Sequence, residues 1–339
     1  MPSTFLVTGA AGFIGSHLVE ALLARGHLVV GVDNFHPYYD PARKRANLKE
    51  VRDAVGDGFT FIEGDTRDAT LIDSIFAKTK IDGIAHLAAM AGVRASIDDP
   101  QTYYDVNLNG TLRLLDASVG RTAATASAPQ RPNFVLGSTS SVYGDTKEIP
   151  FVETDPCDRP LAPYSASKRA AEMLGYTYHH LHGLDVTVLR FFTVYGPRNR
   201  PDMMAHKLAD NIFGGRKVSV YSPDEMQRDW TYVSDVAEGV ANALERRLGY
   251  EICNIGRGEP VVLADFIRLM EKLSGGKTSL EPAAAPKADM SVTYANISKA
   301  GALLDYRPTT SVEEGIASFL AWYQRAVRGS EPGDHQGSL

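Results

Sequence analysis

The sequence predicts an α/β fold: a doubly wound sheet of parallel strands with a smaller C-terminal α/β domain. Through the first half, short apolar runs alternate with helix-forming stretches, a pattern typical of parallel strands covered by helices on both faces. A glycine-rich turn joins the first apolar run to the first helix-forming stretch. After about residue 190 the alternation breaks down around Pro197, Pro201 and Pro223, which indicates a second domain.

Six apolar runs in the first half are interpreted as strands, because turn or helix-forming residues bound each of them. They cover residues 4–9, 28–34, 59–65, 83–89, 133–138 and 186–192. The stretch 15–26 predicts the first helix, 234–247 predicts a later helix, and 250–256 predicts one more strand. From Val261 to about Arg325, helices and loops are expected to dominate.

These elements predict two domains and a tail. The larger domain is expected to comprise 1–190 plus 232–257, and the smaller domain 191–231 plus 258–327. Residues 119–132 are interpreted as a loose surface insertion, and 328–339 as a disordered tail, because both are poor in large apolar residues.

Composition excludes several classes of function. A net charge of −6 argues against a general binder of nucleic acid or acidic membranes, so a few local Arg or Lys residues must hold any polyanionic ligand. Only Cys157 and Cys253 are present, without metal or redox spacing, which fits a cytoplasmic protein. We expect neither a signal peptide nor a membrane span, because no apolar run approaches about 20 unbroken residues.

The segment "LVTGAAGFIGSHL" is typical of a dinucleotide-binding turn. Gly9 allows a tight turn, Gly12 lets the backbone approach a pyrophosphate, and Gly15 lets helix and strand pack closely. Asp33 ends the second strand, where a carboxylate binds the adenosine ribose and repels a 2′-phosphate, so NAD is favoured over NADP. Asp65 follows the third strand and is either near the adenine or a turn residue.

Two Tyr-x-x-x-Lys patterns occur, and only one lies in helix-forming sequence. Tyr143 and Lys147 are separated by "GDT", whereas Tyr164 and Lys168 stand in "YSASKRAAEML", where i, i+4 spacing places both on one face. A lysine ammonium beside a phenol is expected to lower the pKa of Tyr164 and make it a general base. The alternative is a surface tyrosine with a solvated lysine.

Several motifs together resemble a known family. "TGAAGFIG", "HLAAMAGVR", "DVNLNGT", "STSSVYG", "YSASK" and "RFFTVYGPRNRPDM" are similar to those of the extended short-chain dehydrogenases that act on nucleotide sugars, and among these to the UDP-glucuronate 4-epimerases. The resemblance extends from about residue 4 to 325. It implies a Rossmann domain that binds NAD, a smaller domain that binds a UDP-sugar, and a homodimer joined by a four-helix bundle.

The resemblance also implies roles for individual residues. Catalysis is assigned to Thr139, Tyr164 and Lys168. NAD binding is assigned to Gly9, Gly12, Phe13, Ile14, Gly15, Asp33, Asn34, Asp65, Thr66, Leu87, Ala88, Ala89, Asn107, Tyr164, Lys168 and Phe191. Substrate binding is assigned to Arg94, Thr139, Ser140, Ser141, Tyr164, Thr193, Arg200, Val220, Arg228 and Asp289. Arg228 matches an arginine that holds the diphosphate, and Asp289 an acid near the uridine ribose.

Two features indicate the reaction. The related dehydratases carry an Asp-Glu pair after the catalytic threonine, but this chain has Ser140 and Ser141, which do not titrate near neutral pH. The site is therefore expected to oxidise the sugar at C4 and to return the hydrogen, as a 4-epimerase does. Thr193 and Arg200 match the family's carboxylate-binding pattern, although Arg200 could instead be a solvated loop residue. Arg94 could serve the diphosphate or the carboxylate.

Alternatives stay open within this interpretation. A UDP-glucose/UDP-galactose 4-epimerase would differ only in the substituent at C6, and a catalytically silent NAD-binding regulator would share the fold. His179, His180 and His182 are interpreted as the surface of a helix end, with no metal site expected. Trp230 is expected to pack in the core.

Overall fold

The computed structural model describes residues 2–54, 56–120, 131–283 and 290–329. The expected tail from residue 330 on, and 121–130 of the expected insertion, lie outside these ranges. No helix in the described part of the chain combines the length and apolar character that crossing a bilayer requires.

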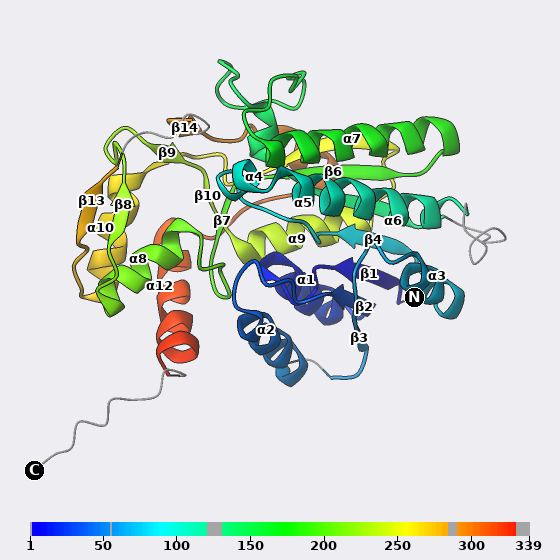
Figure 1. The fold of residues 1–339 in the computed structure, drawn as a ribbon, viewed down its shortest axis with the longest axis horizontal. Helices are drawn as coiled ribbons and strands as arrows, with labels where there is room; N and C mark the ends of the chain where they lie inside the picture. The colour runs from blue at the N-terminus through cyan, green and yellow to red at the C-terminus, as the bar shows by residue number, and fades with distance from the viewer. Residues whose placement is uncertain (1, 55, 121–130, 284–289, 330–339) are drawn as a thin grey trace, which may run out of the picture.

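A seven-stranded parallel sheet forms the centre of the protein (Figure 1). Its strand order is β11-β6-β5-β4-β1-β2-β3, and every pair is parallel. All seven strands expected from the sequence are present, so that prediction is confirmed: β1 (Thr4–Thr8), β2 (Leu28–Asp33), β3 (Phe59–Glu63), β4 (Gly83–His86), β5 (Asn133–Thr139), β6 (Val186–Phe191) and β11 (Tyr250–Ile255). The order reverses between β1 and β4, and a doubly wound sheet binds its ligand at the carboxyl ends of such strands.

Helices cover both faces of this sheet. One face carries α1 (Phe13–Ala24), α2 (Pro41–Ala54) and α9 (Val233–Leu244), and the other carries α3 (Ala69–Lys78), α6 (Gly110–Ser118) and α7 (Pro163–His182). Alternate residues of β1 divide between the two faces of the sheet: Phe5 and Val7 pack with α1 and α9, and Leu6 packs with α3 and α6. This period of two explains why β1 is apolar throughout.

Short helices lead from β4 into α6. They are α4 (Ala95–Asp98), α5 (Pro100–Tyr104) and the π-helical turn η1 (Asp105–Asn109). Asp99 caps α5 by accepting a hydrogen bond from the Thr102 amide, and Pro100 occupies the first position, where no amide donor is needed. These turns border the loop that comes after β4.

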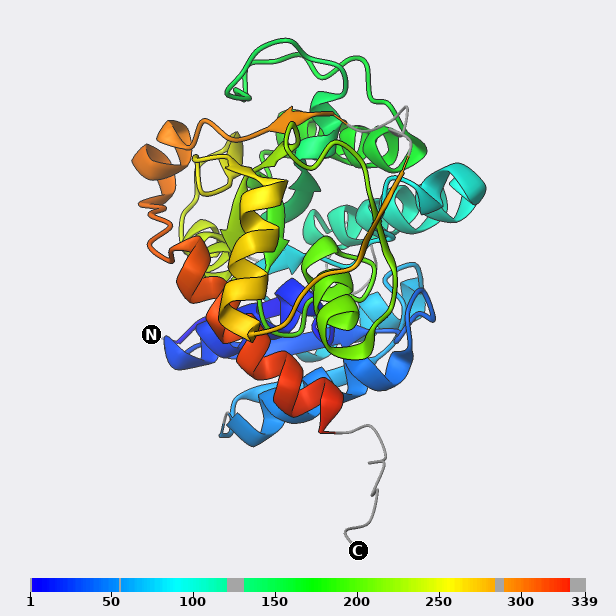
Figure 2. The same ribbon diagram turned by 90° about the vertical axis from the view of Figure 1, so that its left-hand side faces the viewer.

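A second apolar core lies to one side of the sheet (Figures 1 and 2). It is built by helices α8 (Met204–Gly214), α10 (Leu263–Ser274) and α12 (Val312–Tyr323), with the turn η3 (Gln324–Arg328). Short strands join them: β7 (Thr193–Tyr195), β8 (Val218–Val220), β9 (Gln227–Arg228), β10 (Trp230–Tyr232), β12 (Val261–Val262), β13 (Leu280–Pro282) and β14 (Val292–Thr293). Trp230 is buried here against the ring of Phe266, with ring centroids 3.7 Å apart, so its expected place in a core is confirmed.

One segment near the end of the chain packs against the large sheet, although the sequence predicts that it belongs to the smaller domain. Helix α11 (Ser298–Leu304) belongs to the stretch 258–327, but Ala300, Leu304 and Tyr306 lie in the core beneath the large sheet. The Tyr306 hydroxyl donates to the carbonyl of Gly256, just beyond β11. The chain therefore returns to the sheet before it forms α12, because β11 and α9 would otherwise expose apolar surface.

Candidate active site

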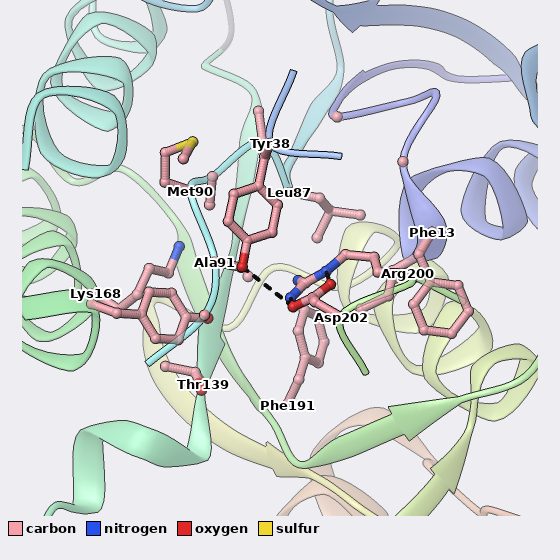
Figure 3. A pocket seen from close by; sticks show the side chains of 18 of the residues that line it. Phe13, Tyr38, Leu87, Met90, Ala91, Thr139, Lys168, Phe191, Arg200 and Asp202 are labelled. Atoms are coloured by element: carbon pink, nitrogen blue, oxygen red, sulfur yellow. Dashed lines mark hydrogen bonds and ion pairs between the residues drawn. The ribbon is translucent and has the colours of Figure 1, made fainter. Parts of the chain in front are cut away.

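A cavity of about 820 Å³ opens at the carboxyl ends of the sheet strands. The glycine turn, the segments after β2, β4 and β5, and the start of α7 line one part of it. Another part is lined by residues 191–194 and by Arg200, Asp202, Met203, Met204 and Lys207, so both cores contribute walls (Figure 3). Its volume lies in the range of cavities that bind small molecules and cofactors.

The glycines predicted to bind a dinucleotide are required by the backbone. Gly9 has φ +71°, and a Cβ there would lie 2.9 Å from the amide nitrogen of Ala88. A Cβ on Gly15 would lie 2.1 Å from the carbonyl oxygen of Gly9, so helix α1 crosses the turn closely. Gly12 precedes α1 and offers no side-chain cap, which leaves the first amides of the helix to an anion. This geometry fits a pyrophosphate.

Asp33 fits a ribose-binding role. Its carboxylate is buried at the end of β2, where it accepts hydrogen bonds from the amides of Ala11 and Phe35, at 3.2 and 2.8 Å. The Lys44 ammonium lies 3.7 Å away. The carboxylate is thus fixed at the edge of the cavity, beside the glycine turn.

Asp65 lines the cavity and also forms hydrogen bonds with two neighbouring side chains, Arg67 and Asn34. It accepts hydrogen bonds from the Arg67 side chain, at 2.9 and 2.7 Å, and from Asn34 at 2.8 Å. The hydrogen bond from Arg67 lowers the pKa of Asp65 to about 2. Both interpretations of this residue, as a neighbour of the ligand and as a turn residue, are therefore compatible with its position.

Asn107 lies outside the cavity but supports its wall. Its amide accepts from the Met90 amide at 2.8 Å and donates to the Met90 carbonyl at 3.0 Å and to the Ser167 hydroxyl at 2.9 Å. Asn107 therefore joins the loop after β4 to helix α7. The remaining residues assigned to NAD line the cavity: Phe13, Ile14, Asn34, Thr66, Leu87, Ala88, Ala89, Tyr164, Lys168 and Phe191.

Thr139, Tyr164 and Lys168 meet at one wall of the cavity. Thr139 ends β5 and caps the turn η2 (Ser140–Tyr143) by accepting from the Ser141 amide at 3.2 Å. Tyr164 and Lys168 lie in the first turns of α7, which begins at Pro163, so the predicted helical pair is confirmed. Ser140 and Ser141 also line the cavity.

The electrostatics of this wall differ from the expectation that Lys168 lowers the pKa of Tyr164. Burial raises the pKa of Tyr164, and the hydrogen bond with Thr139 and the charge of Arg200 lower it only in part. Burial also lowers the pKa of Lys168, to about 8, against an opposing effect of Glu172. Because the ammonium and the phenolate both lose hydration here, the neutral phenol is favoured in the protein alone.

A buried ion pair holds the wall in place. Glu172, one turn after Lys168 on α7, accepts from Arg190 of β6 at 2.8 and 3.1 Å and from the Ser138 hydroxyl at 2.5 Å. Glu172 is 0% exposed and Arg190 is 1% exposed. Ser138 precedes Thr139, so the carboxylate fixes the end of β5 relative to α7.

The other Tyr-x-x-x-Lys pattern is structural. Tyr143 is buried, donates a hydrogen bond to Asn254 at 2.6 Å, and presents its ring to the Arg190 guanidinium at 4.7 Å. The Lys147 side chain is 88% exposed and lies outside helical sequence. The predicted separation of the two patterns is confirmed, since only Tyr164 lines the cavity.

The remaining residues assigned to substrate binding divide into three groups. Arg94, Thr193 and Arg200 line the cavity. Arg228 and Val220 do not: Arg228 donates to the carbonyls of Gln227 and Ser291, and Val220 is buried in the second core. Asp289 lies outside the described residues.

Sequence reasoning missed several residues of the cavity, and two of them contact Arg200. Tyr38 and Asp202 line the cavity, and Asp202 forms a bidentate ion pair with Arg200, at 2.9 and 2.6 Å (Figure 3). Asp202 stands in the motif "RPDM", so its proximity to Arg200 could be predicted, but a neighbouring acid in sequence does not establish a bidentate pair. Tyr38 carries no pattern that relates it to residues 200–202.

The histidines near the end of α7 do not belong to the cavity. The ring of His179 makes a hydrogen bond with the Leu184 carbonyl at 2.9 Å. Across the described residues, no cluster of three or more His, Cys, Asp or Glu is arranged to hold a metal ion.

Comparison with known proteins relates the chain to sugar-nucleotide enzymes. The family model described as GDP-mannose 4,6 dehydratase matches residues 6–319. A UDP-glucuronate 4-epimerase of Thermodesulfobacterium geofontis is 41% identical over 324 residues, which cover 95% of this chain and 97% of the relative.

Solved structures extend the comparison. The UDP-glucuronic acid 4-epimerase of Bacillus cereus, in complex with UDP-glucuronic acid and NAD, superposes with a TM-score of 0.84 at 34% identity, covering 95% of this chain and 99% of that one. A UDP-glucose 4-epimerase of Thermotoga maritima, with UDP-glucose, gives 0.83 at 28% identity, with the same coverages.

The buried ion pair generates a stability prediction. Glu172→Ala should lower the free energy of unfolding by about 3–5 kcal/mol, because Arg190 is left buried without its counter-charge. Urea denaturation measures this change. Asp53→Ala, which removes an exposed partner of Lys49, is the matched control and should change stability by less than about 0.5 kcal/mol. Equal losses in the two variants would contradict a specific role of the buried pair.

Proposed function

This chain belongs to the family described as GDP-mannose 4,6 dehydratase, and from that premise we propose that it is an NAD-dependent UDP-glucuronate 4-epimerase. It would interconvert UDP-glucuronate and UDP-galacturonate through a transient 4-keto sugar. The observation that carries the proposal is the pairing, in one cavity, of Tyr164 and Thr139 with the cation Arg200. The first two suit oxidation at C4, and the third suits a carboxylate at C6.

The cofactor site fits NAD. The glycine turn and the start of α1 would hold the pyrophosphate, and Asp33 the adenosine ribose. When bound, NAD supplies the acceptor that takes hydride from C4 and returns it. Because the reaction has no net redox change, the cofactor would not need to be exchanged between turnovers.

Tyr164 is proposed as the base that removes the proton from O4. Thr139 would donate a hydrogen bond to the same oxygen and orient it. Burial favours the neutral phenol, so a neighbouring positive charge must stabilise the phenolate. The Arg200 charge already does this in part, and Lys168, buried at the same wall, would hold the cofactor's ribose and add to the effect.

The two serines limit the chemistry that is available once the sugar is oxidised. Elimination of water needs an acid for the leaving hydroxyl and a base for the C5 proton. Ser140 and Ser141 line the cavity and can donate and accept hydrogen bonds, but a hydroxyl does not titrate near neutral pH. The 4-keto sugar is thus left to turn and take back its hydrogen on the other face.

The C6 carboxylate also has to be restrained. A 4-keto glucuronate is a β-keto acid, which loses carbon dioxide readily when its carboxylate can rotate. Arg200 and Thr193 would fix that group through a charge-assisted hydrogen bond and a hydroxyl. Arg94, on the loop after β4, would serve the carboxylate or the diphosphate.

The rest of the UDP-sugar would bind the part of the chain formed by 191–231 and 258–327. Arg228 and Val220 lie beyond the cavity, in β9 and β8. We propose that the diphosphate and uridine extend from the cavity toward these strands. Asp289 is the proposed partner of the uridine ribose.

A homodimer is proposed on the outer face of α7. Tyr104, Met173, Tyr176 and Leu181 are exposed by 40%, 58%, 53% and 65%. Three of them are on α7, which packs beside α6, so two copies could pair these helices as a four-helix bundle. Light scattering would then give twice the mass of the 36.8 kDa chain.

The free, buried thiols of Cys157 and Cys253 suit the reducing cytoplasm, where we propose that the enzyme works.

Tyr164→Phe should abolish epimerisation while NAD content and melting temperature stay near those of the native enzyme, because only the phenolic oxygen is lost. Turnover is measured with UDP-glucuronate by separating the two uronates. Tyr143→Phe is the control and should keep substantial activity, since Tyr143 does not line the cavity. A Tyr164→Phe variant within about tenfold of wild type would remove Tyr164 as the base.

Arg200→Ala should separate the two 4-epimerase activities. A charge-assisted hydrogen bond contributes roughly 1.5–3 kcal/mol. The kcat/KM for UDP-glucuronate should therefore fall about 10- to 150-fold. UDP-glucose has a neutral hydroxymethyl group at C6, so any kcat/KM for it should lose only the smaller effect of the Arg200 charge on Tyr164 and should fall much less.

The measurement is the ratio of the two losses in one preparation, with wild type assayed on both sugars. Equal losses would assign Arg200 to the diphosphate, to the fold or to Tyr164, and not to the C6 carboxylate. Wild-type turnover of UDP-glucose alone would favour the UDP-glucose/UDP-galactose 4-epimerase.

A further inference from the structure

The arginine proposed to bind the sugar carboxylate already carries a carboxylate of the protein. Arg200 Nε donates to Asp202 Oδ1 at 2.9 Å, and Nη2 donates to Oδ2 at 2.6 Å. The two residues lie in the cavity wall, with side chains 21% and 32% exposed. An acid beside the site of an anionic substrate repels that substrate. The Asp202–Arg200 pair would therefore weaken binding unless it also improved the contact between Arg200 and the substrate.

The geometry of the guanidinium allows Arg200 to bind Asp202 and a substrate carboxylate at the same time. A guanidinium has five N–H groups in one plane, and Asp202 binds the side formed by Nε and Nη2. The end of the guanidinium, formed by Nη1 and by the second N–H of Nη2, can bind a second carboxylate through two parallel hydrogen bonds. One arginine can thus hold a fixed carboxylate on its side and a substrate carboxylate on its end.

Asp202 is itself held by a residue of the segment that follows β2. The Tyr38 hydroxyl donates to Asp202 Oδ2 at 3.3 Å, and the Tyr38 ring lies 5.7 Å from the Arg200 guanidinium carbon (Figure 3). Tyr38 belongs to the segment after β2, a few residues beyond Asp33. It also packs closely on Gly92, where a Cβ would lie 2.5 Å from the phenolic oxygen. Tyr38 thereby ties Asp202 to the segment after β2.

The ion pair stays charged in this environment. Burial raises the pKa of Asp202, but the hydrogen bond and charge of Arg200 outweigh it and bring the pKa below its ordinary value. Asp202 is therefore an acceptor at neutral pH and is unsuited to act as a proton donor. Its contribution is to orientation.

We propose that Asp202 is a positioning residue that determines specificity for a sugar with a C6 carboxylate. It holds the Arg200 guanidinium from the side, so that the end of the guanidinium faces the sugar carboxylate in one orientation. Tyr38 orients Asp202 in turn. This inference rests on the proposed function, because it assumes that Arg200 binds the C6 carboxylate.

The orientation has a chemical consequence for the 4-keto sugar. If the carboxylate rotates, the C5–C6 bond can break: its electron pair remains on C5 as the enolate of the 4-ketone, carbon dioxide leaves, and C5 takes a proton. The product is a UDP-4-keto-pentose. The hydride taken from C4 would stay on the cofactor, so each such event would leave the protein in its NADH-bound form. A loosened Arg200 should therefore increase this side product as well as weaken binding.

The experiment compares three variants of the full-length, NAD-loaded protein. Asp202→Asn keeps the shape but loses the charge and Tyr38→Phe loses only the hydroxyl. Asp53→Asn, which changes an exposed acid of α2 outside the cavity, is the matched control. Calorimetric Kd values for UDP-glucuronate and UDP-glucose, kcat/KM for UDP-glucuronate, and the fraction of UDP-4-keto-pentose by mass spectrometry are measured for each. Melting temperature and NAD content report the fold.

Asp202→Asn should weaken UDP-glucuronate binding on the order of tenfold and change UDP-glucose binding by less than about threefold. The fraction of decarboxylated product should rise several-fold. Tyr38→Phe should act in the same direction by about two- to threefold, and Asp53→Asn should leave every value unchanged.

Unchanged or tighter binding of UDP-glucuronate by a folded Asp202→Asn variant would overturn the inference, because Asp202 would then only compete for Arg200. An equal loss for both sugars would assign Asp202 to the fold. The proposed function is judged separately, on wild type: absence of UDP-glucuronate turnover there would refute the function itself.

Discussion

The buried carboxylate of Glu172 is the constraint on which the catalytic wall depends. It lies on α7, four residues after Lys168 and eight after Tyr164, and binds Arg190 of β6 and Ser138 of β5. An isolated charge at this depth would cost several kcal/mol, so the carboxylate, the guanidinium and the hydroxyl are stable there only together. Their mutual geometry sets the distance between the helix and the two strands, and with it the positions of the residues that flank them.

A second set of polar contacts fixes the substrate side of the cavity. Arg198, between β7 and α8, binds Glu20 of α1 at 2.7 Å and Glu50 of α2 at 2.9 Å. Arg43 of α2 donates toward His206 of α8 at 3.0 Å. Since Arg200 lies only two residues after Arg198, the residue proposed to bind the sugar carboxylate is anchored on the helices of the sheet. These contacts therefore fix the substrate side of the cavity relative to the cofactor side.

The sequence was sufficient for the features that depend on local pattern. Apolar runs predicted all seven sheet strands, and the glycine turn predicted a close approach that only glycine permits. Helical context separated Tyr164 from Tyr143. Features that depend on distant partners were missed or misjudged. The contact of Tyr38 with Asp202 joins residues 164 apart, and the sign of the Tyr164 pKa shift depends on how completely the fold removes water around it.

The central claim is that the cavity oxidises a UDP-sugar at C4 and returns the same hydrogen to the other face. UDP-glucuronate carrying deuterium at C4 tests this claim most directly. Incubated with the purified protein in ordinary water, it should give UDP-galacturonate with the deuterium retained at C4, as mass spectrometry and proton NMR would show. Product that has exchanged its C4 deuterium for solvent hydrogen would contradict the claim.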